Sequence, residues 1–384
     1  MLDFHERVIL SSPEDSLEVR HLVLKGSNYE IGKKLGEIAK EVHGIEKKPS
    51  EDLLQTRCQR IYLEKNYPIY LERMKGTAAT YNKDLSKDAV DFSLLGELAL
   101  DTGCSAVYYP PNSTASGHGI ISRNLDFYMP SKTPAFSKPY IVEMYPDEGY
   151  PSITILSFQL LGEALEGINS EGLTVIHLAD DESAVNHSIE PTFSNAVGIN
   201  ELKSVQLLLD TCATVEEAKE VLLTNKHFYI FQPIHLLIAD RFGNSFVWEY
   251  SHAHNKEYIV DRKEDTPQIV TNFLLHRYEA IEVIPKTSED KICPYNRYRV
   301  LHDAIEDCTE KFTIDFTKKT NALVFVEETS YMHPPEIPVR TLLHNIYDID
   351  DRSIEISFYL RDGANHRYGT SIRTPYYEFS IKNQ

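Results

Sequence analysis

Near its N-terminus the chain repeats apolar residues at the spacing of an α-helix. Four of them predict a helix over 27–44: Ile31, Leu35, Ile38 and Val42. Ser27 and Glu30 stand three residues apart at its start, which is the pattern of a capping box. An extended segment over 21–26 precedes this helix, and the helical style continues beyond it. We therefore expect residues 1–103 to be mainly helical after a short strand-like start.

Beyond residue 103 the pattern changes to short runs of β-branched and aromatic residues, which are typical of strands. Six such runs predict strands: 104–111, 117–126, 152–159, 172–179, 234–240 and 244–251. Residues 204–225 have the pattern of two short helices, the second capped by Thr214, and 295–310 that of another. A hairpin over 341–363 closes the chain. The mixture predicts an α+β fold in which layers of sheet and helix pack together.

Composition narrows the class of partner. The chain has 384 residues and a formal net charge of −19, with 42% hydrophobic residues. Nucleic acids and anionic membranes reward clustered Lys and Arg, so the acidic balance argues against both as partners. No apolar run reaches the ~20 residues of a membrane span, and the first residues lack the pattern of a secretory signal. We expect a cytoplasmic protein that acts on a small molecule, and the composition leaves a homo-oligomer open.

Metal and phosphate sites find little support in the sequence. None of the five cysteines is spaced C-x-x-C, so the thiols fit a reduced state better than a zinc or disulfide framework. The stretch GSNYEIGKK at 26–34 lacks the spacing of a phosphate-binding loop. His252 and His254 share one face of a strand, but no acidic residue or cysteine nearby completes a ligand set. We therefore expect neither a metal nor a cofactor.

One cysteine has an unusual set of neighbouring residues in the sequence. Gly103 precedes Cys104, and a glycine permits backbone conformations in which the thiol reaches its own preceding carbonyl. The strand pattern starts at Cys104, so the residue lies at the leading end of a strand. The next predicted strand carries Arg123, Asn124 and Asp126, which come within reach if the two strands form a hairpin. Alternation then places Asn124 and Asp126 on one face and Arg123 on the other.

These residues, GCS at 103–105 with SRNLDF at 122–127, resemble the signature of the cysteine N-terminal nucleophile (Ntn) hydrolases. That family includes choloylglycine hydrolases, penicillin V acylases, acid ceramidases and acyl-coenzyme A:6-aminopenicillanate acyltransferases. Further similar motifs follow in family order: VLKGSNYEIGKKLGE, GINSEGLTVIHLADD, ATVEEAKEVL, IADRFGNSFVWEYS, IVTNFLLH and YNRYRVL. Together they extend over roughly residues 21–363. The resemblance implies a four-layer αββα sandwich and hydrolysis of a linear amide in an N-acylated small molecule.

The resemblance also implies a maturation step. The chain would cut itself between Gly103 and Cys104, which makes 1–103 a pro-segment and 104–384 the catalytic domain. Cys104 would then be the nucleophile and its freed α-amine the base. An α-amine has a pKa near ~8 and a thiol one near ~8.5, so the two can exchange a proton at neutral pH.

The other family roles map onto single residues. Asp126 matches the aspartate that orients the amine and the thiol, and Arg123 the arginine that keeps the thiol partly ionised. Asn272 matches the amide that donates to the oxyanion. Arg297 matches a second arginine near the nucleophile, although Arg299 is left as an alternative. Where the family often has a second oxyanion asparagine, this chain has Ala179, whose main-chain N–H still serves.

Alternative functions remain at this stage. An acyltransferase on the same scaffold would pass the acyl group to an amine, and a non-catalytic descendant would keep the fold as a binding protein. A papain-like hydrolase would pair Cys104 with His177 or His276 and needs the cysteine at a helix N-terminus. The substrate pocket is expected from loops within 128–150 and 160–168, with Tyr128, Phe136, Tyr140 and Phe158 as candidate lining residues or as ordinary core aromatics.

Overall fold

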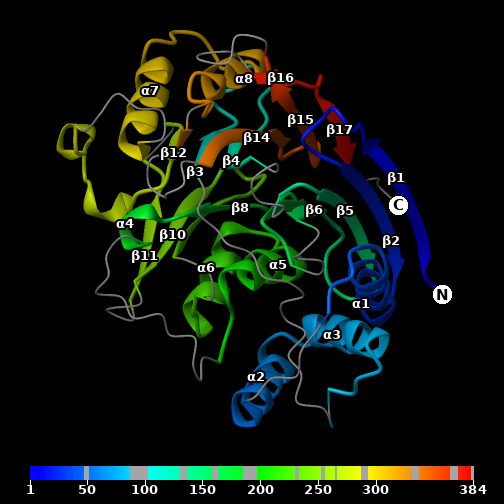
Figure 1. The fold of residues 1–384 in the computed structure, drawn as a ribbon. Helices are drawn as coiled ribbons and strands as arrows, with labels where there is room; N and C mark the ends of the chain where they lie inside the picture. Colours follow the sequence, from blue (N-terminus) through cyan, green and yellow to red (C-terminus); the bar gives the residue numbers. More distant parts are fainter. Residues whose placement is uncertain are drawn as a thin grey trace.

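In the computed structural model the chain forms two large β-sheets that pack face to face, with helices on both outer faces (Figure 1). The structure describes residues 1–46, 52–85, 87, 103–129, 136–157, 163–184, 197–229, 233–251, 256–263, 266–286, 293–327, 329–330, 337–363 and 371–381. The predicted helical run just before Gly103, the His252/His254 pair and Phe158 lie outside these ranges.

The first sheet has nine strands. In spatial order they are β1 (Asp3–Leu10), β2 (Val19–Gly26), β5 (Pro139–Pro146), β6 (Ser152–Ser157), β7 (Glu166–Asn169), β8 (Thr174–Ala179), β9 (Ile234–Ala239), β10 (Ser245–Ser251) and β11 (Lys256–Asp261). Neighbouring strands are antiparallel except β2 and β5, which run parallel. A parallel pair requires a long crossover, and here the crossover contains the helices of the N-terminal segment and the first hairpin of the second sheet.

The second sheet has eight strands and carries the predicted nucleophile. Its main path runs through β12 (Gln268–Val270), β3 (Gly103–Tyr109), β4 (Ile120–Tyr128), β14 (Ile337–Asp348), β15 (Ser353–Asp362) and β16 (Ser371–Arg373). Two short strands pair beside this path: β13 (Thr329–Ser330) on β14 and β17 (Tyr377–Ser380) on β15. β3 and β4 form the antiparallel hairpin that the sequence predicts.

Helices cover the outer face of each sheet. The first sheet packs on α1 (Asn28–Glu37), the π-helical turn Ile38–Val42, α2 (Leu53–Asn66), α3 (Pro68–Thr80), α5 (Glu201–Thr211) and α6 (Val215–Thr224). The second packs on α7 (Pro294–Glu306) and α8 (Ile314–Ala322). A short helix, α4 (Asp181–Ala184), follows β8. The architecture is a four-layer αββα sandwich, the α+β fold that the resemblance implies.

Local signals in the sequence explain where several helices begin. The predicted capping box is present at α1, where the hydroxyl of Ser27 accepts from the Glu30 N–H and the Glu30 carboxylate accepts from the Ser27 N–H. Thr214 caps α6 by accepting from the N–H of Glu217, as predicted. Such caps satisfy N–H groups that the first helical turn leaves without partners.

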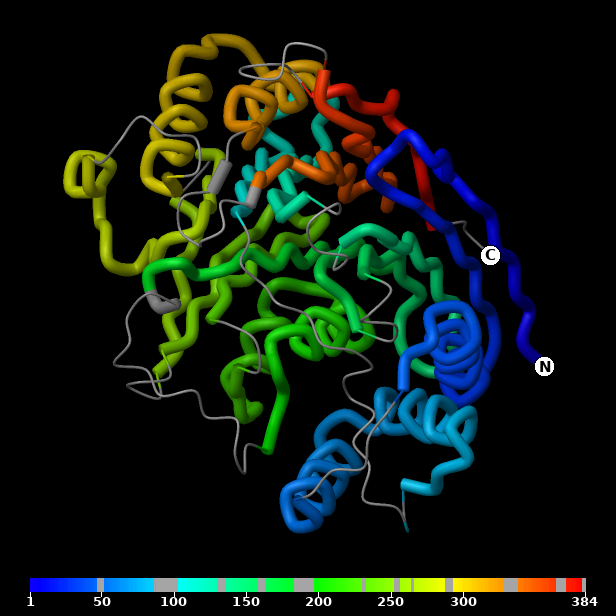
Figure 2. The backbone as a smooth tube through the Cα atoms, in the orientation of Figure 1, coloured from blue at the N-terminus to red at the C-terminus, as the bar shows by residue number. Residues whose placement is uncertain are grey.

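The described part of the N-terminal segment contains strands as well as helices. Besides its helices it contributes β1 and β2 to the first sheet, and Gly103 opens β3. In Figure 2 these first strands run beside the end of the chain, where the His21 ring contacts Phe379 at 5.0 Å between centroids. Segments from both ends of the sequence therefore complete one edge of the sandwich.

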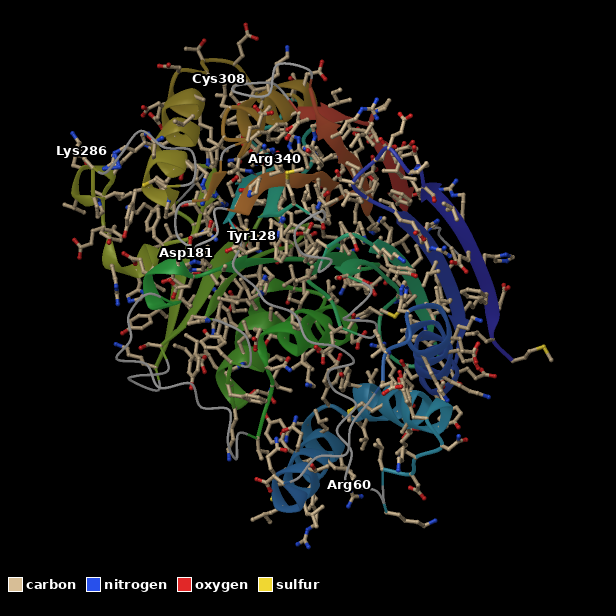
Figure 3. All side chains as sticks on the ribbon, in the orientation of Figure 1. Arg60, Tyr128, Asp181, Lys286, Cys308 and Arg340 are labelled. Carbon is tan, nitrogen blue, oxygen red and sulfur yellow. The ribbon has the colours of Figure 1, made fainter. Side chains whose placement is uncertain are left out.

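The main apolar core lies between the two sheets. It joins residues of the second sheet, among them Cys104, Ala106 and Leu125, to residues of the first, such as Ile153, Ile176 and Leu237. Side chains fill this space, whereas Lys286 and Cys308 lie at the outside of the molecule (Figure 3). Among the described residues, no helix is both long and apolar enough to cross a bilayer.

Candidate active site

The β3–β4 hairpin decides which side chains surround Cys104. Its register sets Gly103 opposite Asp126 and Cys104 opposite Leu125. Paired residues of an antiparallel ladder point to the same face, so Cys104 joins Leu125 in the core between the sheets. Asp126 points to the other face, beneath α7. The thiol of Cys104 and the carboxylate of Asp126 therefore lie on opposite sides of the Gly103–Cys104 peptide.

On the core side, the thiol of Cys104 meets a buried cation. Arg123 Nη2 lies 3.4 Å from Sγ of Cys104 and donates as well to the carbonyl of His177 at 3.2 Å. Cys104 is 1% exposed and Arg123 is fully buried. Burial raises the pKa of the thiol, and the charge of Arg123 together with a hydrogen bond from the main chain of Ala179 opposes that rise. The effect of burial prevails, so the pKa of the Cys104 thiol is raised overall, opposite to what the resemblance implies.

The position of Arg123 depends on a carboxylate that sequence reasoning missed. Arg123 Nε forms an ion pair with Glu166 on β7 of the facing sheet. Glu166 accepts in addition from the hydroxyl of Tyr347 at 2.9 Å and from the side-chain amide of Asn345. An ion pair in the interior keeps its strength only when further hydrogen bonds satisfy it. From sequence, Glu166 falls in an expected loop, 160–168, whereas it opens strand β7.

On the outer side, polar groups converge on the main chain of Cys104. Its N–H donates to Oδ1 of Asn272 at 2.6 Å, and its carbonyl accepts from Nη1 of Arg297. Arg297 Nη2 also donates to Oδ1 of Asn272 at 2.7 Å, and its Nη1 lies 3.6 Å from Oδ2 of Asp126. Thr341 on β14, another residue missed from sequence, donates to Asp126 at 2.5 Å. Burial raises the pKa of Asp126, and the nearby Arg297 opposes the rise.

Asn272 is held in one orientation. Arg297 donates to its oxygen, and its Nδ2 donates to the carbonyl of Ala179 at 2.8 Å. The main chain of the same residue is fixed as well, because the N–H of Asp181 donates to its carbonyl at 3.0 Å. The amide oxygen of Asn272, not its amide N–H, faces the main chain of Cys104, and Ala179 lies beside both Asn272 and the thiol.

Two alternatives from the sequence can now be decided. Arg297 is buried against Asp126, whereas Arg299 donates to the carbonyls of residues 281 and 285 at 3.4 Å each. Arg297 is therefore the arginine beside Cys104. A papain-like arrangement needs the cysteine at a helix N-terminus, but Cys104 lies on strand β3.

Part of the expected substrate pocket belongs to the regular core. Residues 139–146 form β5 and residues 166–169 form β7, so these parts of the two expected loops are strands. Tyr128 and Phe136 lie in the core that contains Cys104. Tyr140 lies on the opposite face of the first sheet, where its hydroxyl contacts Nε2 of His43 at 2.6 Å. Tyr140 is therefore an ordinary core aromatic and not a pocket residue, because strand alternation turns it toward the helices.

One set of side chains has the spacing of metal ligands among the described residues. His118, Asp348 and Asp350 place their ligand atoms within 4.8 Å of one another. They lie at the ends of β4 and β14 that are remote from Asp126. His118 Nδ1 lies 3.0 Å from each carboxylate oxygen of Asp348, and Asp350 accepts from the N–H of Gly119 at 2.9 Å. These contacts among protein groups account for the cluster, and we assign no metal to it.

Comparison with solved structures finds proteins of similar architecture. One is penicillin V acylase from Agrobacterium tumefaciens, with 18% identity over 71% of this chain and 86% of that chain and a TM-score of 0.45. A mutant conjugated bile acid hydrolase from Clostridium perfringens shares 13% identity over 73% and 99%, with a TM-score of 0.49. An N-acylethanolamine-hydrolyzing acid amidase ortholog from Caenorhabditis elegans shares 13% over 64% and 92%, with a TM-score of 0.43.

Of the two sequence comparisons, the one with family models is the more decisive. The other finds no curated protein that matches the chain. The sequence model of one family, described as acyl-coenzyme A:6-aminopenicillanic acid acyl-transferase, matches residues 113–358. This match covers more than half of the chain and includes Asp126, Asn272 and both arginines of the site, but it starts after Cys104. The chain belongs to the acyl-coenzyme A:6-aminopenicillanic acid acyl-transferase family.

Proposed function

We propose that the chain cuts itself between Gly103 and Cys104, and that the freed Cys104 then hydrolyses a linear, non-peptide amide of an N-acylated small molecule. One observation carries the proposal. The thiol of Cys104 lies beside Arg123 on one face of β3, while the N–H of the same residue is held by Asn272 on the other. A single residue is thus arranged both to attack a carbonyl and to present a new amine.

In the first step Sγ of Cys104 attacks the carbonyl carbon of Gly103. The C–N bond breaks, the thiol proton passes to the departing nitrogen, and a thioester forms. Water hydrolyses the thioester, which leaves a carboxylate on Gly103 and a free α-amine on Cys104. A side chain at position 103 would crowd Asp126, since a Cβ there would lie 3.1 Å from Cβ of Asp126 and 3.2 Å from its Oδ2.

In the second reaction the α-amine takes the proton of the thiol. Asp126 and the oxygen of Asn272 hold the amine, and Arg123 stabilises the thiolate. The thiolate attacks the amide carbonyl of the substrate, and N–H groups of Asn272 and Ala179 receive the oxyanion. The amine product leaves with the proton, and water releases the acyl group as a carboxylic acid. No cofactor is needed for these steps.

We further propose that residues 1–103 act as a pro-segment that stays bound to the catalytic domain 104–384. β2 pairs with β5 along seven residue pairs, Arg20–Tyr140 to Gly26–Pro146. Arg73 of α3 forms a bidentate ion pair with Asp210 of α5, at 2.7 and 2.9 Å, with 3% and 0% of the side chains exposed. These contacts do not depend on an intact Gly103–Cys104 bond.

Family membership favours a second candidate function that uses the same acyl-enzyme. An amine would replace water as the acceptor, which makes the protein an acyltransferase. A panel of N-acyl amino acids and N-acyl amines, assayed with and without an added acceptor amine, separates the two. Formation of the new amide in preference to the acid would identify the transferase.

The decisive experiment for the main proposal is the intact mass of the purified protein. We expect the 44.0 kDa chain to be replaced by two fragments that meet between Gly103 and Cys104. A chain that persists uncut under conditions in which it is folded would contradict self-cleavage and would support the non-catalytic binding protein.

A further inference from the structure

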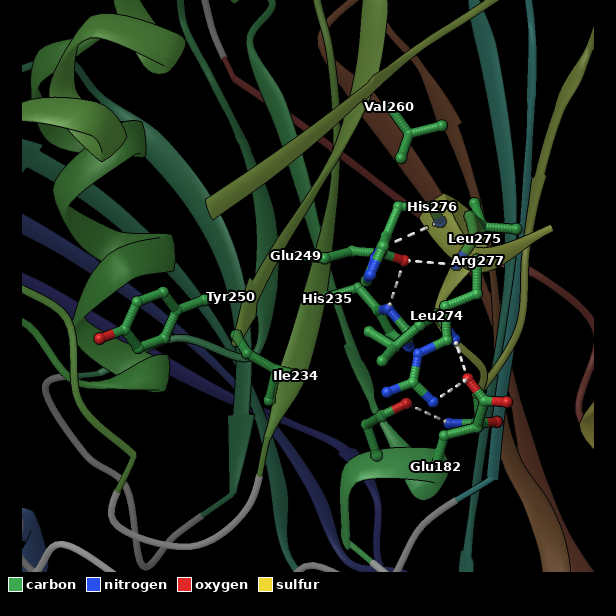
Figure 4. Close-up of polar contacts among 12 residues, drawn as sticks. Glu182, Ile234, His235, Glu249, Tyr250, Val260, Leu274, Leu275, His276 and Arg277 are labelled. Carbon is green, nitrogen blue, oxygen red and sulfur yellow. Dashed lines mark hydrogen bonds and ion pairs between the residues drawn. The ribbon is translucent and has the colours of Figure 1, made fainter. Parts of the chain in front are cut away.

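The segment that carries Asn272 is held by two carboxylates outside the proposed catalytic group, the buried Glu249 and the partly buried Glu182. The segment, residues 272–278, follows β12 and includes a 3-10 turn, Leu275–Arg277. Because it lies at the end of a strand, its main-chain N–H groups have no neighbouring strand to bond with. Carboxylates accept from the N–H groups of residues 274–276 instead, while those of 277 and 278 donate to carbonyls within the 3-10 turn (Figure 4).

Glu249 holds the middle of the segment. Its two oxygens accept from the N–H groups of Leu275 at 2.7 Å and His276 at 3.2 Å. Nδ1 of His276 lies 2.5 Å from the carboxylate, and Nδ1 of His235 lies 3.1 Å from it. Glu249 on β10 is paired directly with His235 on β9, and both side chains are fully buried. Glu249 is therefore part of the buried region of the first sheet.

Glu182 contacts the beginning of the segment and also a residue outside it. It accepts from the N–H of Leu274 at 3.0 Å and from the hydroxyls of Tyr278 at 2.6 Å and Tyr295 at 2.5 Å. Arg277 approaches it at 3.6 Å. The side chain of Glu182 is 12% exposed.

Glu182 and its partners come from the three parts of the chain that build the outer side of the site. Glu182 itself follows Ala179 by three residues, on α4. Leu274 follows Asn272 by two residues, and Tyr295 precedes Arg297 by two residues on α7. One carboxylate thus connects the supports of Ala179, Asn272 and Arg297, the three groups that bond with one another around the main chain of Cys104.

We infer that Glu182 and Glu249 are positioning residues, which fix the 272–278 segment so that the Asn272 amide stays on the N–H of Cys104 and the carbonyl of Ala179. The inference rests on the proposed function of this site. Neither carboxylate contacts Cys104 in the described hydrogen bonds, so each acts through Asn272 and Arg297. A shift of about 1 Å in a reacting or stabilising group can lower a rate about 100-fold.

The test measures the first-order rate of cleavage at Gly103–Cys104 in full-length variants. Glu182→Ala and Glu249→Ala remove each acceptor, while Glu182→Gln and Glu249→Gln keep its shape and one acceptor oxygen. We expect cleavage to slow roughly 10- to 100-fold in the alanine variants and less in the glutamine variants. Hydrogen exchange should rise in peptides that cover residues 273–278, because the carboxylates no longer accept from the N–H groups of Leu274, Leu275 and His276.

Two controls separate positioning from general loss of stability. Glu257→Gln changes a carboxylate on β11 that accepts from Trp248 at 3.3 Å and has no described hydrogen bond to the segment. Leu222→Ala creates a cavity beneath α6, where Leu222 is 1% exposed. Both should cleave at the wild-type rate, Leu222→Ala in spite of a lower melting temperature. If an alanine variant does not fold, the double variant Tyr278→Phe/Tyr295→Phe removes two donors of Glu182 and should slow cleavage in the same direction.

The outcomes are distinct. A wild-type chain that is never cut contradicts the proposed function, and the positioning role falls with it. A wild-type chain that is cut, together with folded Glu182 and Glu249 variants that are cut equally fast, overturns the positioning role alone. Rates that decline only in proportion to melting temperature, along the line set by Leu222→Ala, overturn it as well.

Discussion

Nη2 of Arg123 lies 3.4 Å from Sγ of Cys104 in the middle of the sandwich, where water is excluded from both groups. The guanidinium also forms an ion pair with Glu166 of the facing sheet, so the carboxylate offsets part of the positive charge beside the thiol. Charges interact strongly in such surroundings, and the reactivity of the thiol depends on the balance of three groups that come from β3, β4 and β7.

Replacing Cys104 by alanine should abolish both self-cleavage and amide hydrolysis and leave the protein folded. The same sulfur would attack the Gly103 carbonyl and later the carbonyl of the substrate, and the change removes only one small buried atom. Intact mass and circular dichroism on one preparation check both parts. Normal cleavage in Cys104→Ala would show that another protease cuts the chain.

Replacing Arg123 by methionine should raise the pKa of the Cys104 thiol further, because the cation that opposes the effect of burial is gone. The thiolate fraction at neutral pH then falls, and cleavage slows. The pH dependence of thiol alkylation in wild type, Arg123→Met and Arg123→Lys measures the shift, and the lysine variant should fall between the other two.

The same change leaves Glu166 buried without its cation, a situation that costs about 3–5 kcal/mol in other proteins. The double variant Arg123→Met/Glu166→Gln removes that charge and should recover much of the stability while the thiol pKa stays high. A double variant with both stability and wild-type thiol pKa would disprove the role of Arg123.

Asn272→Ala should lower kcat by ~10²- to 10³-fold with little change in KM, since its N–H bonds strengthen only as charge develops on the oxyanion. Loss of an acceptor for Arg297 and Cys104 should also cost about 1–3 kcal/mol of stability. The kcat and the melting temperature are measured together. A variant that loses stability but keeps its turnover would reduce Asn272 to a structural residue.

Arg73→Met should weaken the attachment of the N-terminal segment. It leaves the carboxylate of Asp210 buried without its ion pair, for an expected loss of about 3–5 kcal/mol. The exposed pair Lys75–Glu72 on the same helix offers a matched control, and Lys75→Met should change stability by only about 0–1 kcal/mol. After cleavage the two wild-type fragments should elute together in gel filtration. Separation of the wild-type fragments without denaturant would contradict a retained pro-segment.

Acid should destabilise the protein through Glu249. Burial by itself raises the pKa of this group, but hydrogen bonds from His235, His276 and the Leu275 N–H lower it to about 2, below the 4.5 of an exposed glutamate. A carboxyl whose pKa is lower in the folded state stabilises the fold above pH 4.5 and loses that contribution as the pH falls toward 2. The loss amounts to roughly 3 kcal/mol.

Urea unfolding at several pH values between 5 and 2.5 checks this expectation. Glu249→Gln should start less stable and decline less steeply over that window, while Glu216→Gln, which changes a carboxylate with 77% exposure, should decline like the wild type. Asp180 and Asp181 near His235 are present in all three proteins and cancel from the comparison. Equal slopes in the wild type and Glu249→Gln would contradict the lowered pKa.

Elements set by neighbours in the sequence were predictable. The capping box of Ser27 and Glu30, the Thr214 cap and the β9–β10 hairpin are all closed by groups a few residues apart. The strands of the β3–β4 hairpin were predicted in the same way, and with them the separation of Arg123 and Asp126 onto opposite faces. Short-range geometry and strand alternation suffice for such features.

What only the tertiary structure decided involves partners far apart in the chain. The parallel pairing of β2 with β5 joins segments more than a hundred residues apart, so no local pattern marks β2 as an inner strand. Glu166 meets Arg123 only because the two sheets face each other, and Glu182 and Glu249 meet the Asn272 segment only where β8, β10 and β12 end together. The choice of Arg297 over Arg299 follows from which face of α7 rests on the sheet. A sequence specifies the chemistry of each group, whereas the distance between groups on different strands is fixed by the packing of all layers at once.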